Sequence, residues 1–151
     1  MKEVLFVNKK YLLLLFLLIV PILTSCGKKE KYSLSCVMDI GGFSTTYKFV
    51  FENGRISKVR QEDYRNFQEN ELLKFTCDTT IKECVETQRQ AIQEMCDKGD
   101  LLDCSIKTTD ESVSFTNYLN QESIDEMIKG AGGVTKKQIK AYLEAEGFEC
   151  E

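Results

Sequence analysis

The sequence predicts an α+β domain: an antiparallel sheet of about five strands, in the order βββ-α-ββ-α-α, with helices packed on one face. Three observations support this fold class. Apolar and polar residues alternate in several short segments, which is the period of half-buried strands. Tight-turn signals join these segments, so neighbouring strands pair antiparallel. Two capping boxes mark helix starts, and strands and helices come in separate runs, as in α+β folds.

The N-terminal half of the domain contains the first three strands. Two alternating segments lead to Asn53-Gly54, a pair suited to the positive φ angles of a type I′ hairpin turn. This turn would place Phe51 opposite Ile56 and Glu52 opposite Arg55. The predicted strands are residues 33–40, 45–51 and 55–64.

A central helix follows, beginning at the capping box formed by Thr80 and Glu83 and ending at Gly99. Residues 102–106 alternate as the next strand, and residues 108–111 supply the turn of a second hairpin that leads to the strand at 113–115. The stripe that the helix is expected to bury comprises Ile81, Val85, Ile92 and Met95, with Cys84 and Cys96 near the same side.

Two helices close the chain. A short helix over residues 121–129 is predicted to stop at Gly130, and a last helix over residues 136–146 starts at the capping box of Thr135 and Gln138. Gly147 suits a left-handed position that lets Phe148 fold back on Leu143, as in a Schellman motif.

The first 25 residues have the order of an export signal. Lys2, Lys9 and Lys10 precede about a dozen apolar residues from Tyr11 to Leu23, whereas a membrane-spanning helix needs roughly 20. The alternative is a short membrane anchor that stays attached to the domain.

The segment Leu23-Thr24-Ser25-Cys26 favours export with removal of the signal, because it resembles a bacterial lipobox. This resemblance implies that residues 1–25 are removed and that Cys26 becomes the lipidated first residue. Two acyl chains hold a protein stably to a bilayer. We therefore expect a lipoprotein on the extracytoplasmic side of a bacterial cell membrane, with a tether over residues 26–31 and one domain over residues 32–151. The tether lysines would favour anionic headgroups or act as a solvated spacer.

The charge of the mature chain argues against nucleic acid as a partner. Removing residues 1–25 takes away three Lys and one Glu, which leaves 20 − 3 = 17 basic and 24 − 1 = 23 acidic residues, a net charge of about −6. Nucleic-acid binding needs a basic surface that neutralises phosphates. No cofactor is predicted.

The six cysteines after Cys26 predict three disulfides, among 15 possible connectivities. A metal site is not predicted, because the chain has no histidine and no CxxC pair. The first strand and the chain end would be joined by Cys36 with Cys150. Cys96 and Cys104 lie on either side of the Gly99 reversal, which leaves Cys77 with Cys84 by elimination.

Most of the mature chain resembles the small YehR-like lipoproteins of bacteria. The resemblance rests on the lipobox, the hairpin segment Tyr47–Gly54, the order of the elements and the ending Tyr142–Cys150. It implies an α+β fold and a membrane-tethered protein, with no catalytic residues to carry over. The cysteines are more numerous here than in the simplest members.

Three classes of function follow, and catalysis is the least favoured. Without histidine, a Ser-His-Asp or Cys-His arrangement cannot form. Glu122, Asp125 and Glu126 lie on a short helix, where carboxylates are usually solvated, and residues 130–133 lack the Gly-Lys-Ser/Thr of a P-loop. We therefore predict a non-enzymatic binding or interaction module for an envelope protein or a small ligand. The alternative is a structural or envelope-maintenance lipoprotein, and a small carboxylate-dependent enzyme comes third.

Overall fold

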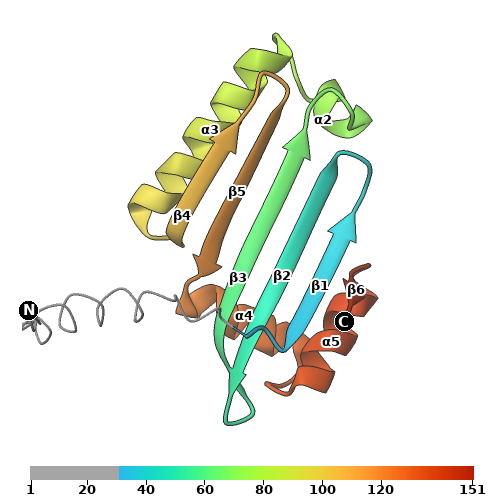
Figure 1. The fold of residues 1–151 in the computed structure, drawn as a ribbon, viewed down its shortest axis with the longest axis vertical. Helices are drawn as coiled ribbons and strands as arrows, with labels where there is room; N and C mark the ends of the chain where they lie inside the picture. The colour runs from blue at the N-terminus through green and yellow to red at the C-terminus, as the bar shows by residue number, and fades with distance from the viewer. Residues whose placement is uncertain (1–30) are drawn as a thin grey trace, which may run out of the picture. The chain divides into compact units, whose positions relative to one another are not determined.

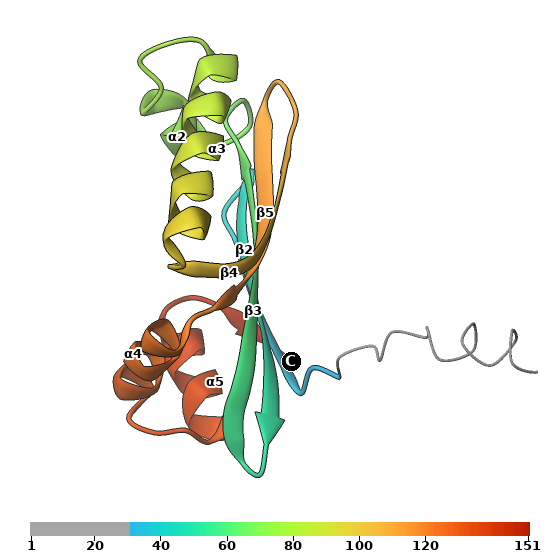
Figure 2. The ribbon, with the colours of Figure 1, turned by 90° about the vertical axis from the view of Figure 1, so that its left-hand side faces the viewer.

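The computed structural model describes residues 31–151, which form one compact unit. This unit is the predicted α+β fold: helices cover one face of an antiparallel sheet, and the other face is open (Figures 1 and 2). The signal, the lipobox and tether residues 26–30 lie outside the described residues. The elements are β1 (Leu34–Asp39), β2 (Phe43–Glu52), β3 (Arg55–Asn66), α2 (Glu71–Phe75), α3 (Ile81–Lys98), β4 (Leu101–Thr108), β5 (Ser112–Leu119), α4 (Gln121–Ala131), α5 (Lys136–Ala145) and β6 (Glu149–Cys150).

The sheet has six strands in the order β4-β5-β3-β2-β1-β6, and every neighbouring pair is antiparallel. The β2–β3 hairpin has the predicted turn, with φ angles of 53° at Asn53 and 75° at Gly54. Its register is also as predicted, because Phe51 pairs with Ile56 and Glu52 with Arg55. Pairing of β3 with β5 joins this hairpin to the second one, so β3 lies near the middle of the sheet.

The helices α3 and α5 begin and end as their sequences predict. Thr80 and Glu83 form the capping box of α3, which ends at Gly99 with φ of 81°. Thr135 caps α5 in the same way. After α5, Gly147 has φ of 95° and the Phe148 N–H donates to the Leu143 carbonyl at 3.0 Å, which is the bond of a Schellman motif.

The predicted end of α4 at Gly130 is wrong. The helix continues to Ala131, and Gly132 is the left-handed cap, with φ of 67°. Gly130 instead provides space, since a Cβ there would lie 3.0 Å from Cζ of Tyr142. The glycine therefore permits α4 and α5 to approach closely.

The predicted strands 33–40 and 102–106 and the helix stripe place three apolar residues on buried faces that are exposed in the structure: Ile40, Leu102 and Met95. Leu102 is 44% exposed because the register shifts between Leu102 and Ser105, where Asp103 takes a φ of 51°. Leu101 packs against the core in its place. On α3, Val85 and Ile92 are buried as expected, but Met95 is 44% exposed.

The sequence did not predict α2 or β6, which are too short to show a period. Asn70 fixes α2: its Oδ1 accepts from the Leu73 N–H, and its Nδ2 donates to the carbonyls of Ile40 and Gly41, both at 2.8 Å. The β6 strand pairs with β1 directly opposite Cys36, to which Cys150 is disulfide-bonded.

Two hydrophobic clusters lie between the sheet and the helices. Figure 2 shows α3 over one end of the sheet and α4 with α5 over the other. The cluster under α4 and α5 contains Leu34, Cys36, Phe49, Val59, Ile124, Ile139 and Leu143. The cluster under α3 contains Phe67, Val85, Ile92, Val113 and Phe115.

Three disulfides link these parts of the fold, and they join the pairs that the sequence favoured. They are Cys36–Cys150, Cys77–Cys84 and Cys96–Cys104. The first connects β1 to the chain end, and the third connects α3 to β4.

Candidate functional site

The open face of the sheet is built from side chains that alternate with the buried ones. Because directly paired residues of antiparallel strands point to the same face, the register places the open-face residues in three rows across five strands. These rows are Asp39–Ser44–Tyr64–Ser114–Lys107, Val37–Thr46–Glu62–Thr116–Ser105 and Ser35–Lys48–Arg60–Tyr118–Leu102.

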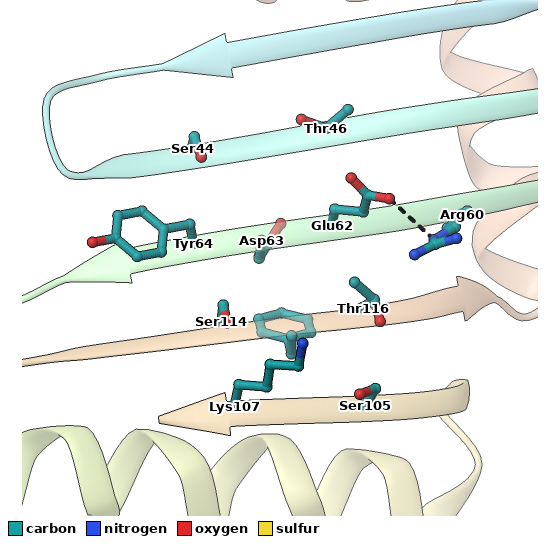
Figure 3. Close-up of a pocket in the computed structure, with 11 residues that line it drawn as sticks. Ser44, Thr46, Arg60, Glu62, Asp63, Tyr64, Ser105, Lys107, Ser114 and Thr116 are labelled. Atoms are coloured by element: carbon teal, nitrogen blue, oxygen red, sulfur yellow. Dashed lines mark ion pairs between the residues drawn. The ribbon is translucent and has the colours of Figure 1, made fainter. Parts of the chain in front are cut away.

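A groove of about 570 Å³ lies on this face (Figure 3). Its size falls within the usual range of small-molecule sites, roughly 300–1,000 Å³. Asp63 and Phe115 also border the groove, although their alternation places their side chains toward the helices. We call this surface the sheet groove. Its open-face lining comprises Ser44, Thr46, Arg60, Glu62, Tyr64, Ser105, Lys107, Ser114 and Thr116.

Glu62 lies in the middle of the sheet groove and is held by two cations. Lys48 Nζ contacts both carboxylate oxygens, at 2.9 and 2.8 Å, and Arg60 Nε lies 3.1 Å from Oε1. The carboxylate is still 29% exposed. It is therefore a fixed acceptor whose charge is already balanced.

The groove hydroxyls are the groups left over for a ligand. Ser44, Thr46, Ser105, Ser114 and Thr116 make no side-chain hydrogen bond to any other residue of the described part of the chain. Lys107 likewise forms no ion pair within residues 31–151. In Figure 3 its side chain extends from β4 toward β5. The groove thus offers five hydroxyl groups and one ammonium group.

Both ends of the groove are ordered by local contacts. The Tyr64 hydroxyl accepts a hydrogen bond from Asn66 Nδ2 at 3.1 Å, and the ring remains 38% exposed. At the other end, a side-chain hydrogen bond with Tyr32 raises the pKa of Arg60; burial opposes this shift, and the charge of Glu62 adds to it. The residues that precede β1 therefore reach the groove.

The helix face carries a polar layer between the two hydrophobic clusters. Asp63 is buried there and pairs with Arg65 at 3.3 Å, while Gln61 Nε2 donates to it at 3.1 Å. The Arg65 guanidinium also lies over the rings of Phe43 and Phe115. Asn117 is 1% exposed, and its Oδ1 lacks a hydrogen-bond partner among the described residues. Asp63 and Glu62 thus act on opposite faces.

The carboxylates singled out on α4 do not form a site. Asp125 accepts from Gln121 Nε2 at 2.8 Å on the exposed side of the helix. Over residues 31–151, no group of three or more Cys, Asp or Glu side chains is placed to hold a metal ion. In the same range, no helix combines the length and apolar character needed to cross a membrane.

Comparisons with protein families, curated proteins and solved structures found no match for this chain. The resemblance to the YehR-like lipoproteins therefore stays a prediction.

Sequence reasoning did not identify the sheet groove, although a signal for it was present. The polar positions of β2, β3 and β5 alternate with the apolar ones, which by itself predicts only half-buried strands. What joins them into one groove is the pairing of β3 with β5, and no local turn specifies that contact.

Proposed function

We propose that this chain is a lipid-anchored binding module of a bacterial envelope, and that the sheet groove is its binding surface. The observation that carries the proposal is the groove itself, which gathers five hydroxyls and an unpaired lysine from β2, β4 and β5 around the central strand β3. A solvated sheet face on a purely structural lipoprotein needs no such concavity. The lipobox at residues 23–26 supports the anchor.

The tether would keep the groove near the bilayer. Tyr32, which contacts Arg60, comes only six residues after Cys26. Six extended residues span at most about 20 Å. A ligand in the groove would therefore be held close to the membrane surface.

Binding accounts for the groove better than catalysis does. The two carboxylates that border it, Glu62 and Asp63, are consecutive in β3 and so point to opposite faces. Glu62 is also paired with Lys48 and Arg60, so its carboxylate is held in place as an acceptor of hydrogen bonds.

Photocrosslinking in cells tests the binding surface. A photoreactive residue in place of Thr116 lies in the groove, whereas one in place of Glu94, whose side chain is 71% exposed on α3, lies on the helix side. We expect a discrete adduct from position 116 that position 94 does not give. Equal labelling from both positions, or no adduct from position 116, would contradict the proposed binding surface.

The anchor is tested separately by Cys26→Ser. This exchange should abolish fatty-acid labelling and signal cleavage, because the thiol is the group that would carry the lipid. Cys104→Ser, which removes a structural cysteine, should keep both. Normal labelling and cleavage of Cys26→Ser would show that the N-terminus is not a lipobox.

A further inference from the structure

The lining of the sheet groove differs from that of most small-molecule sites, which are mainly apolar. Its open-face side chains are polar or charged, and the only aromatic ring among them is that of Tyr64; its other apolar surface belongs to the methyl and methylene groups of polar side chains. The groove therefore selects its ligand mainly through its polar groups. A ligand of this groove must be held by hydrogen bonds and charge.

The free hydroxyls indicate a ligand that is itself rich in hydroxyls. They flank the central strand on both sides: Ser44 and Thr46 on β2, Ser114 and Thr116 on β5, with Ser105 beyond them on β4. Each hydroxyl both donates and accepts a hydrogen bond. Ligand hydroxyls have the same double capacity, so sugar rings would satisfy these groups along the whole width of the groove.

Glu62 and Tyr64 supply the two other contacts that a sugar ring needs. The carboxylate of Glu62 is fixed by Lys48 and Arg60 and has room to accept from ligand hydroxyls. Tyr64 presents an exposed ring whose hydroxyl is tied to Asn66. The apolar face of a sugar ring can pack on such a ring while its hydroxyls reach the strands.

The charge of the groove selects an anionic ligand. Glu62 is balanced by Lys48 and Arg60, and Lys107 adds an ammonium group that has no partner among residues 31–151. The groove lining thus has two cationic side chains, Arg60 and Lys107, and one open-face carboxylate, Glu62, which Lys48 also contacts, on a chain that is acidic overall. An acidic ligand would place its charge near Lys107.

We propose, on the basis of the proposed binding function, that the sheet groove binds an acidic oligosaccharide, a glycan whose sugar rings carry carboxylate groups. The hydroxyl rows, Glu62 and Tyr64 recognise the rings. Lys107 recognises a carboxylate.

Binding of a uronic-acid tetrasaccharide by residues 27–151 with intact disulfides tests this inference. The probe is tetragalacturonate, and its methyl ester is the matched neutral probe. We expect the acid to bind about tenfold more tightly than the ester in calorimetric titrations, because a charge-assisted hydrogen bond contributes that much.

Lys107→Gln should remove this preference for the acid over the ester. Thr116→Val and Ser105→Ala should weaken both probes, and the control Lys98→Gln on α3 should change neither.

The outcomes separate this inference from the proposed function. No binding of the acid at millimolar concentration, or equal binding of acid and ester, overturns the acidic glycan. Lys107-dependent binding to phosphatidylglycerol vesicles without binding of the tetrasaccharide also overturns it, and assigns the groove to lipid headgroups. With any of these three results, a groove-specific adduct at position 116 would still support the sheet groove as the binding surface. Loss of that adduct would remove both proposals.

Discussion

At the scale of single residues, burial decides which polar groups are structural and which are available. Asp63 and Glu62 are neighbours in β3, yet Asp63 is 5% exposed and Glu62 is 29% exposed. The first pairs with Arg65 under the helices, and the second lies in the sheet groove. Alternation along one strand is enough to give adjacent carboxylates different roles.

Tyr47 gives a pH-dependent prediction at this scale. Burial raises the pKa of its phenol above the usual value of 10.0, and the charges of Asp63 and Tyr142 add to the shift. Below pH 10 the phenol is protonated in both the folded and the unfolded chain. As the pH rises through 10, the phenol of the unfolded chain ionises first. The free energy of unfolding therefore falls from this pH until the folded chain ionises as well, at its higher pKa.

We therefore expect Tyr47→Phe to lose less stability than the wild type between pH 9 and 11. Urea unfolding at several pH values measures this difference. Below pH 9 the gap between the two free energies of unfolding should be constant. Parallel curves across the whole range would show that burial of Tyr47 does not disfavour its ionised form.

At the scale of elements, capping and turn residues determined the boundaries that could be predicted. Thr80, Gly99 and Asn53-Gly54 have local roles, so their positions in the sequence suffice. Gly130 was misread because its role is tertiary: it lies inside α4 and leaves room for the Tyr142 ring of α5. Such a contact leaves no signal near Gly130 itself.

Gly130→Ala tests this tertiary role. Alanine in a helix interior normally stabilises by about 0.5–1 kcal/mol relative to glycine. Here the new Cβ would lie 3.0 Å from Tyr142, so we expect a net loss of about 1 kcal/mol in the free energy of unfolding. In a Tyr142→Ala background the same exchange should become stabilising. An equal effect in both backgrounds would exclude the contact as the cause.

At the scale of the whole molecule, long-range pairing determines what the sequence could not show. The strands β1 to β5, the helices α3 and α5 and the Cys96–Cys104 pair were predictable, because turns, caps and chain reversals are local. Cys36–Cys150 was predicted as a link between the first strand and the chain end, and Cys77–Cys84 by elimination. The groove depends on β3 pairing with β5 across α2 and α3, and the exposure of Leu102 depends on a bulge in β4. The first arises from how distant segments align, and the second from a bulge inside the β4–β5 hairpin that no turn or cap residue marks, so composition and periodicity report neither.

The Cys36–Cys150 disulfide acts at this same scale, because it spans almost the whole domain. Its cysteines are separated by 114 residues, whereas Cys96 and Cys104 are separated by 8. A cross-link that closes a longer loop removes more entropy from the unfolded chain: about 5 kcal/mol for the first and about 2.5 kcal/mol for the second. Cys36→Ala with Cys150→Ala should therefore lower the free energy of unfolding about twice as much as Cys96→Ala with Cys104→Ala.

Urea unfolding of both double variants under oxidising conditions measures this comparison. The larger loss should be accompanied by a larger m-value, because the released chain exposes more surface when it unfolds. Cys36 is fully buried in the cluster under α4 and α5. Cys36→Ala therefore removes packing contacts as well as the disulfide, and the measured loss contains both effects. Equal losses in the two double variants would mean that β6 is held by its strand pairing and packing rather than by loop closure.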